Sequence, residues 1–219
     1  TASGINFYGH QCGVGVTEGS PLGEGFLAHV CEQWEGAAQP LIDAGIRSVS
    51  ARIGMILSSQ GGALTKMLPA FKLGLGGVIG AGSQHMSWVS LPDAVRILLL
   101  AVEDRSIEGP LNVVSPQPVT NRVFTQSLGA ALKRPTFFPM PALAVKALFG
   151  KMGTEVLCSD VGVLPQVLLD RGFEWDFTDI NTSKNIYGIC YGCIFFTNII
   201  IRYLICWLVR SIKIGVKIC

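Results

Sequence analysis

A strand pattern between two helical patterns limits most strongly how this chain can fold. Residues 48–57 read SVSARIGMIL, which is typical of a buried β-strand. Residues 24–43 before it repeat apolar side chains every three or four positions, the spacing of an amphipathic helix, and residues 64–73 after it form a second helical pattern. Strands that alternate with helices are typical of α/β proteins with a parallel sheet.

The alternation continues along the chain. Further helices are predicted over 93–104, 120–132, 142–149 and 164–169, and a short strand over 111–114. Pro92 suits a first helical turn, and the Thr120 hydroxyl can accept a free backbone N–H as an N-cap. For residues 24–43 the spacing predicts an inward face made of Phe26, Val30, Trp34, Ala37, Ala38 and Leu41.

Charge and cysteine usage exclude several classes of protein. The 219 residues carry a formal charge of only +2, which argues against a nucleic-acid partner. Cys12, Cys31 and Cys158 are scattered through the body of the chain, which indicates reduced thiols and a cytoplasmic location. The three histidines have no acidic cluster at ligand spacing, so we expect no metal site.

Residues 181–219 differ in composition from the rest. They contain ten Ile, five basic residues and no acidic residue. Three interpretations stay open: translated non-coding sequence, a membrane-associated segment through 186–209, or a packed soluble element. The apolar run over 186–201 is shorter than the roughly 20 residues that span a bilayer.

One segment carries a resemblance to a known family. Residues 61–93 read GGALTKMLPAFKLGLGGVIGAGSQHMSWVSLPD. This segment resembles the region after the sixth strand of extended, epimerase-like short-chain dehydrogenase/reductases. More narrowly, it resembles the atypical branch called epimerase family proteins, which end in a domain of unknown function. The resemblance continues through LNVVSPQPVTN at 111–121 and LPQVLLDRGFEW at 164–175, and covers about residues 1–179.

The resemblance implies a fold and a cofactor. The fold would be α/β: the C-terminal part of a Rossmann-like doubly wound parallel sheet over 1–118, a small α-rich substrate-side subdomain over 119–180, and an atypical tail over 181–219. Intact relatives bind NAD(P) at a G-x-x-G-x-x-G turn, which would precede Thr1 together with four strands. We therefore expect residues 1–219 to be a fragment that binds no NAD(P) tightly; a protein trimmed to a nucleotide-free role is the alternative.

The sequence departs from the catalytic pattern of these reductases. Their Tyr-x-x-x-Lys pair transfers the proton, and a Glu commonly follows the Lys by four residues. When that Glu is aligned on Glu35, Leu27 and Cys31 take the Tyr and Lys positions, and neither can replace them. Ser3 and Tyr8 are the remaining catalytic candidates by resemblance. Their alternatives are a serine that caps a strand end and a packed tyrosine ring.

The resemblance also implies binding residues. Gly54 would lie on the cofactor side, and the substrate side would hold Arg52, Met55, Gln84 and Trp88. Arg52 has an alternative role, since a buried arginine needs an anionic ligand or a carboxylate of the fold. Trp88 has one too, as a packed core ring followed by a helix-start Asp93.

Two functions stay open at this point. The chain is the substrate-side half of an atypical NAD(P)-dependent epimerase/dehydratase-like oxidoreductase, inactive as given, whose substrate is a sugar-like or other small hydroxyl compound. Alternatively, it is a non-catalytic binding or interaction module on the same fold, with the tail as its membrane contact.

Overall fold

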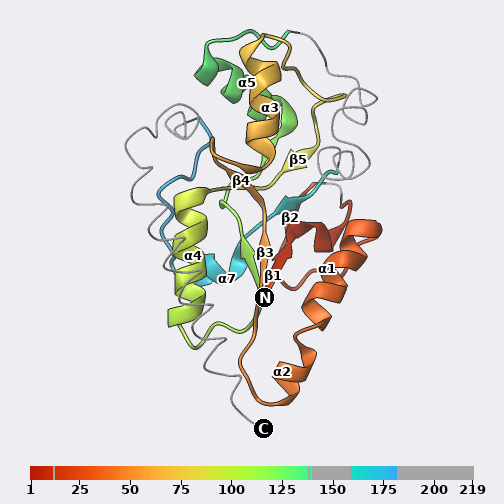
Figure 1. Cartoon of the computed structure of the whole chain (residues 1–219), viewed down its shortest axis with the longest axis vertical. Coiled ribbons are helices and arrows are strands. Elements are labelled where there is room, and N and C mark those ends of the chain that lie inside the picture. Colours follow the sequence, from red (N-terminus) through yellow and green to blue (C-terminus); the bar gives the residue numbers. More distant parts are fainter. Residues whose placement is uncertain (12, 138, 140–158, 182–219) are drawn as a thin grey trace. The chain divides into compact units, whose positions relative to one another are not determined.

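The structure, a computed structural model, describes residues 1–11, 13–137, 139 and 159–181 (Figure 1). The contacts divide the chain after Tyr187 into two units, and every described residue belongs to the first. The helix predicted over 142–149 and the tail segment 186–209 lie outside the described residues.

Three parallel strands form the central sheet, in the order β1 (Ala2–Gly4), β3 (Val49–Ile53) and β7 (Gly109–Val113). The register places Ser3 beside Arg52 and Arg52 beside Asn112. Because side chains alternate along a strand, these three polar residues share one face of the sheet. The opposite face is apolar, and the parallel α/β arrangement predicted from the sequence is confirmed.

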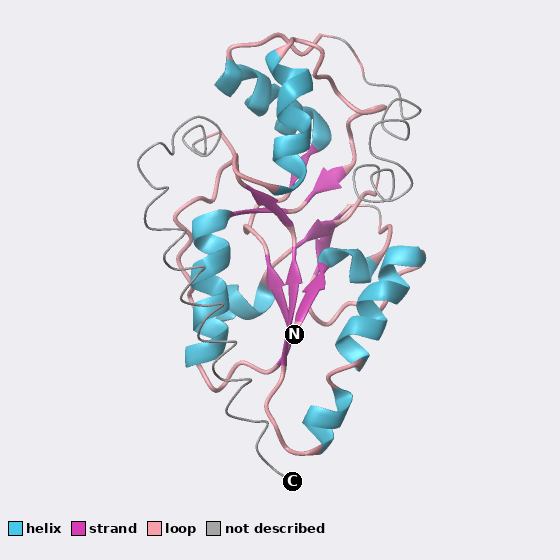
Figure 2. Cartoon of the chain, viewed as in Figure 1, coloured by secondary structure: helices cyan, strands magenta, loops and turns pink. Residues whose placement is uncertain are grey.

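Helices cover both faces of this sheet (Figures 1 and 2). Helix α4 (Leu91–Glu103) covers the apolar face, where Ala94 and Ile97 pack against Leu111 and Val113. The short helix α7 (Gln166–Asp170) adds Leu168 to this core. Helix α1 (Phe26–Gly36) and the short α2 (Gln39–Asp43) follow the 3-10 turn η1 (Ile5–Tyr8) on the other side.

The predicted strand 48–57 is two strands. The strand breaks at Gly54. Before the break β3 pairs with β7, and after it β4 (Met55–Leu57) pairs in parallel with β6 (Trp88–Ser90). A β-carbon at Gly54 would lie 2.7 Å from Val114 Cγ1 and 2.9 Å from the Ser87 carbonyl oxygen. The change of partner therefore depends on a residue without a side chain at this position.

A second core lies beyond β4. Helices α3 (Gly62–Lys72) and α5 (Asn121–Leu132) pack together through Leu68, Phe71, Phe124 and Leu128. The strands β5 (His85–Met86) and β8 (Val119–Thr120) form an antiparallel pair beside them. The predicted Thr120 cap is confirmed, since its Oγ1 accepts the N–H of Val123 at 3.3 Å.

Two sequence predictions for the first half of the chain are wrong. The single helix over 24–43 is interrupted after Gly36. Most of its predicted inward face is turned outward: Phe26, Trp34, Ala37 and Leu41 are exposed, whereas Ala38 of that face is buried and Val30 half-buried. The buried face of α1 holds Ala28 and Cys31 instead. The glycines of residues 13–19 (GVGVTEG), with no apolar strand pattern before them, predict a surface loop. These residues instead contain β2 (Val14–Val16), which pairs in parallel with β9 (Gly162–Val163).

Among the described residues, no helix combines the length and the hydropathy that a membrane crossing requires.

Candidate functional site

A buried ion pair lies on the polar face of the sheet. The Arg52 guanidinium contacts the Glu35 carboxylate at two points, with Nε donating to Oε1 and Nη2 to Oε2, both at 2.9 Å. The Ser3 hydroxyl donates to the same Oε1 at 2.7 Å. Burial lowers the pKa of Arg52, but its hydrogen bonds to Glu35 and Tyr8 more than offset this, so the net pKa is raised. The carboxylate partner that the sequence left open for Arg52 is therefore Glu35.

Tyr8 joins the same network from the end of η1. Its hydroxyl donates to Asn112 Oδ1 at 2.7 Å and accepts Arg52 Nη1 at 2.9 Å. Its ring is fully buried, and burial raises the pKa of the phenol although Arg52 acts in the opposite direction. The Arg52 guanidinium carbon also lies over the Phe7 ring, 3.4 Å from its centroid. The Tyr8 hydroxyl thus has its donor and acceptor positions occupied.

Glu18 extends the network to the far strand. One carboxylate oxygen accepts the Asn112 N–H, and the other accepts the Gln166 N–H at the start of α7, both at 3.1 Å. The Asn112 side-chain amide donates to the Leu164 carbonyl at 3.0 Å. Glu18 therefore holds α7 to the central sheet, a role that sequence reasoning missed because nothing near Glu18 distinguishes it from a solvated loop residue.

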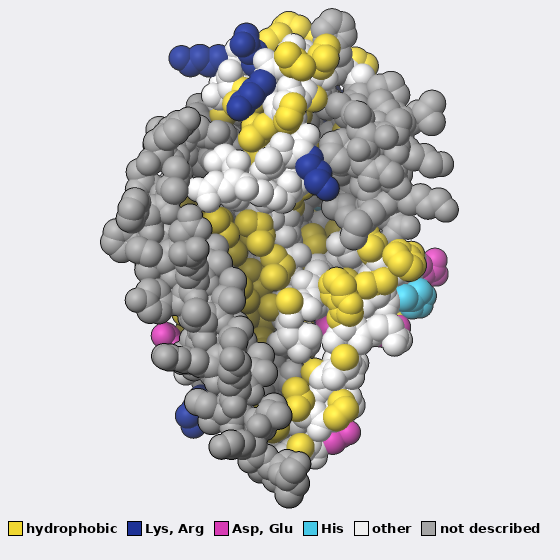
Figure 3. Space-filling model, in the orientation of Figure 1, with side chains coloured by type: hydrophobic (Ala, Val, Ile, Leu, Met, Phe, Trp, Pro, Cys, Tyr) yellow, Lys and Arg dark blue, Asp and Glu magenta, His cyan; other side chains and the backbone are white. Residues whose placement is uncertain are grey.

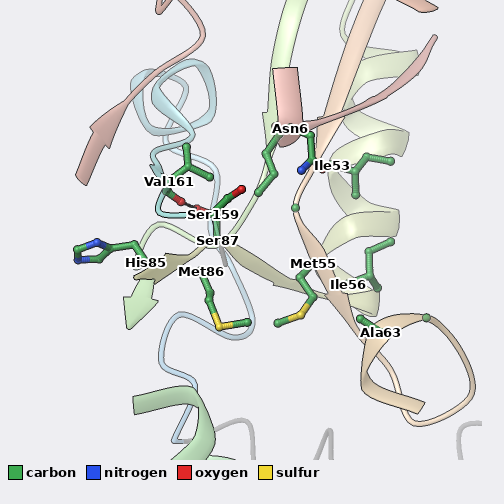
Figure 4. A pocket seen from close by; sticks show the side chains of 13 residues that line it. Asn6, Ile53, Met55, Ile56, Ala63, His85, Met86, Ser87, Ser159 and Val161 are labelled. Atoms are coloured by element: carbon green, nitrogen blue, oxygen red, sulfur yellow. Dashed lines mark hydrogen bonds between the residues drawn. The ribbon is translucent and has the colours of Figure 1, made fainter. Parts of the chain in front are cut away.

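A pocket of about 320 Å³ opens where β1 and β3 end (Figure 4). Two residues of η1, Ile5 and Asn6, form one wall, whereas Gly54 lies between β3 and β4 and Met55 begins β4. Figure 4 shows the Met55 and Met86 side chains converging from two strands. The larger apolar lining side chains are Ile5, Ile53, Met55, Ile56, Met86 and Val161. The carboxyl ends of parallel strands are the usual ligand edge of an α/β sheet.

The described lining of the pocket is almost uncharged. Its polar members are Asn6, His85, Ser87 and Ser159, and no Lys, Arg, Asp or Glu is among the described residues that line it. The Ser87 hydroxyl donates to the Val161 carbonyl and accepts the Val163 N–H, so it links the junction of β5 and β6 to β9. The lining suits a small, weakly polar group rather than a diphosphate.

His85 and Asp160 form a pair at the rim. The ring Nδ1 lies 2.9 Å from Asp160 Oδ1, which also accepts the His85 backbone N–H at 2.8 Å. Burial raises the pKa of Asp160. These hydrogen bonds and the His85 charge lower it by more than burial raises it, so the net pKa is below its ordinary value. Figure 4 shows the imidazole directed away from the side chains that converge on the pocket.

The structure separates the predicted site residues into groups. Ser3, Tyr8 and Arg52 share the buried network, whereas Gly54 and Met55 line the pocket. The remaining two residues are engaged elsewhere: Gln84 Nε2 donates to the Ile79 carbonyl at 3.2 Å, and the fully buried Trp88 donates through Nε1 to the Gln117 carbonyl at 3.0 Å.

Asp93 lies in the first turn of α4, as the helix-start interpretation of this residue predicts. Its carboxylate accepts the Ser90 hydroxyl at 2.8 Å, and the N–H groups of Asp176 and Phe177 at 2.9 and 3.1 Å. It therefore holds the segment after α7 against the start of α4.

The two positions that align with the Tyr-x-x-x-Lys pair do not reach the pocket. Cys31 is a buried free thiol whose sulfur lies beside Gly4 of β1. Leu27 is half-buried in the first turn of the same helix. Across the described ranges, no three His, Cys, Asp or Glu side chains are grouped as a metal site would require.

Sequence reasoning missed much of the pocket. Asn6, Met86 and Ser87 reach it from η1, β5 and the junction of β5 with β6. A signal existed for Asn6, which lies two residues after the end of β1, but none distinguished Met86 from an ordinary core methionine.

Comparison with known proteins identifies relatives over most of the chain. A family model described as a domain of unknown function (DUF1731) matches residues 140–183. The chain is 42% identical over 182 residues to an epimerase family protein of Mycobacterium leprae, covering 83% of this chain and 59% of that protein. The chain thus spans about three fifths of the length of the curated relatives it matches.

Solved structures agree with the sequence comparison. The chain matches human epimerase family protein SDR39U1 (isoform 2), solved with NADPH, with a TM-score of 0.80 and 35% identity over 86% of this chain and 64% of the human one. It matches a nucleoside-diphosphate sugar epimerase of Corynebacterium glutamicum with a TM-score of 0.68 and 33% identity, over 85% of this chain and 36% of that one.

Proposed function

Because this chain belongs to the epimerase family proteins, we propose that it forms the substrate-side part of an NAD(P)-dependent oxidoreductase that acts on a small hydroxyl or carbonyl compound. The observation that carries the proposal is the similarity to the human relative solved with NADPH, which extends over 86% of this chain. A bound nicotinamide would supply hydride transfer, whereas the protein supplies binding and orientation.

The pocket supports this placement. It lies at the carboxyl ends of β1 and β3, where α/β folds bind their ligands. Gly54 and Met55 would face the uncharged ring of the cofactor, with Asn6 as a hydrogen-bonding group beside them. The apolar side chains around them would exclude water from a reacting carbon. We therefore propose a substrate of low charge, such as a sugar-like or other small hydroxyl compound.

The buried network would act by support. Ser3, Tyr8 and Arg52 satisfy one another through Glu35 and Asn112, so we propose that they hold η1, and with it Ile5 and Asn6, against the end of the sheet. The role of Arg52 would be positioning rather than contact with an anionic substrate. Gln84 and Trp88 would shape the second core behind the pocket.

The domain organisation belongs to the same proposal. Residues 1–118 would complete the cofactor-binding domain, and 119–180 would add the substrate-side subdomain.

A chimera tests the function. The N-terminal part of the human relative that this chain does not match would be joined ahead of Thr1, and NADPH binding would be followed by nicotinamide fluorescence. We expect micromolar binding by the chimera and none at that level by residues 1–219 alone, because the described residues offer no glycine turn with the strand and helix that a pyrophosphate needs. Micromolar binding by residues 1–219 alone would contradict the proposed division of the site.

Turnover by the chimera separates the two candidate functions. We expect oxidation of NADPH with small ketones, and a weaker rate after Asn6→Ala. NADPH binding without turnover on any carbonyl compound would instead favour the non-catalytic binding module.

A further inference from the structure

The part of the protein built on α3 and α5 carries basic side chains but no acidic ones. Residues 61–90 and 114–137 contain five Lys or Arg and no Asp or Glu. Three of these cations, Lys72, Lys133 and Arg134, lie at or just after the C-terminal ends of the two helices, and all three are exposed. No ion pair joins any of them to a carboxylate in the described part of the chain.

Large apolar side chains project beside these cations. Leu73 and Leu75, in the turn after α3, are 74% and 61% exposed, and Phe137, after α5, is 86% exposed. Figure 1 draws both segments at the same end of this part of the protein, and the two helices pack together through a shared core. We call these six residues the α3/α5 tip.

Figure 3 shows the same combination on the surface. Yellow and dark-blue side chains lie together over the part that Figure 1 labels α3 and α5, and no magenta side chain is visible among them. Acidic side chains appear on this face only farther away, over the part that holds the central sheet.

Charge alone would not identify a partner, because cations near helix C-termini are favourable to the helices themselves. The exposed leucines and phenylalanine need a separate explanation. They cannot contribute to either core, and they lie on turns rather than along a helix face that could pack on another helix. Gly74, with a φ of +75°, lets the turn carry Leu73 and Leu75 outward on either side of it.

We propose that the α3/α5 tip binds the surface of an anionic lipid membrane. Leu73, Leu75 and Phe137 would enter the boundary between headgroups and acyl chains, where exposed apolar side chains gain free energy by leaving water. Lys72, Lys133 and Arg134 would contact the lipid phosphates around them, with Lys66 and Arg122 adding to the field. This mode needs no membrane-spanning segment.

A nucleic acid fits the tip less well. Its phosphates would satisfy the cations, but two leucines offer its backbone nothing, and a chain with a net charge of +2 lacks the basic field typical of such proteins. The lipid surface accounts for both kinds of side chain.

Vesicle flotation of the full 219-residue chain tests the proposal. One set of vesicles would contain phosphatidylcholine alone and the other about one third phosphatidylserine, at about 0.1 M and about 1 M salt, where the Debye length falls from about 10 to about 3 Å. We expect binding to the anionic vesicles at low salt, a marked loss at high salt, and little binding to the neutral vesicles.

Variants locate the contact. Lys72→Gln should weaken binding about fivefold, since one cation near an anionic surface contributes roughly that factor. The triple variant Lys72→Gln, Lys133→Gln, Arg134→Gln should weaken it by on the order of 100-fold. The triple variant Leu73→Ser, Leu75→Ser, Phe137→Ser should release the protein from the vesicles. Far-UV circular dichroism and an unchanged melting temperature would show that each variant is folded.

Matched control variants remove similar exposed side chains outside the α3/α5 tip. Arg105→Gln neutralises an exposed cation beyond α4, and Leu41→Ser, Ile42→Ser, Ile46→Ser removes three exposed apolar side chains at and after α2. Neither should alter vesicle binding. Equal binding to neutral vesicles, or vesicle binding that the tip variants leave intact, would overturn the proposal. The proposal would also be overturned if the chain did not bind vesicles but was retained on heparin through the same three cations, because its partner would then be a soluble polyanion.

Discussion

Glu35 and Arg52 are joined by two parallel hydrogen bonds of 2.9 Å, although 17 positions separate them in the chain. Their side chains are only 15% and 5% exposed. The pair fastens α1 to the central strand of the sheet and keeps the Tyr8 hydroxyl on Arg52, so one carboxylate organises the polar face below the pocket.

Removing this carboxylate should be costly. Glu35→Ala leaves the Arg52 charge buried without its partner and the Ser3 hydroxyl without an acceptor, so we expect a loss of about 3–5 kcal/mol in the free energy of unfolding. Urea denaturation of the full chain measures it. Glu32→Ala removes an exposed carboxylate from the same helix and should change stability by less than about 0.5 kcal/mol. Equal effects of the two changes would contradict the structural role of the pair.

Tyr8→Phe should destabilise the fold and change its response to alkali. Without the hydroxyl, Asn112 Oδ1 and one Arg52 N–H lose a buried partner, which costs about 1–3 kcal/mol. The pKa of Tyr8 is raised on folding, so its contribution is complete below the unfolded value of about 10 and is lost as the pH rises through the folded value. Wild-type stability should therefore fall more steeply above about pH 10 than that of Tyr8→Phe. Denaturation at several pH values would measure both slopes, and parallel slopes would show that Tyr8 ionises freely.

Asp160→Asn should act at the opposite end of the pH scale. The pKa of Asp160 is lowered on folding, so its contribution is present above the unfolded value of about 4 and is lost as the pH falls through the folded value. We expect the stability of the wild type to decline between about pH 5 and pH 3 more than that of the variant. Asp43→Asn, on the exposed α2, is the matched control and is measured over the same pH range.

Gly54→Ala should disturb the junction of β3 and β4. The added methyl would lie within 3 Å of Val114 and of the Ser87 carbonyl, and overpacking of this kind costs about 1–3 kcal/mol. Gly36→Ala is the control, because a β-carbon there meets nothing within 4 Å, and alanine is the better helix former. Thermal unfolding should show a lower melting temperature for Gly54→Ala and an equal or higher one for Gly36→Ala. A Gly54→Ala protein as stable as the wild type would mean that β4 can move away from β6 at no cost.

Much of the local structure could be predicted from the sequence. The cap at Thr120 and the Pro92 in the first turn of α4 lie where the residue types indicated, because capping and proline geometry depend on a few neighbouring residues. The α/β class followed from the alternation of strand and helix patterns, and residues 61–93 carried the family.

The tertiary structure decided which faces are buried and which strands pair. The stripe through Phe26 and Trp34 predicts an inward face, but the polar row of Ser3, Arg52 and Asn112 draws Glu35 toward the sheet and rotates that stripe outward. Helical spacing cannot anticipate this, because it records which side chains are apolar and not the free energy of leaving a buried arginine unpaired.

Strand pairing and the pocket depend on the same long-range information. The pattern of residues 48–57 predicts one strand. Its break at Gly54 follows from the close approach of Ser87 and Val114, which are far away in the chain. The pocket likewise joins η1, β3, β4 and the β5–β6 junction. The sequence by itself determined the α/β class, most helices, the Thr120 cap and the resemblance to the family, since these can be read from local patterns, whereas strand partners, buried faces and the site were decided by packing between distant segments.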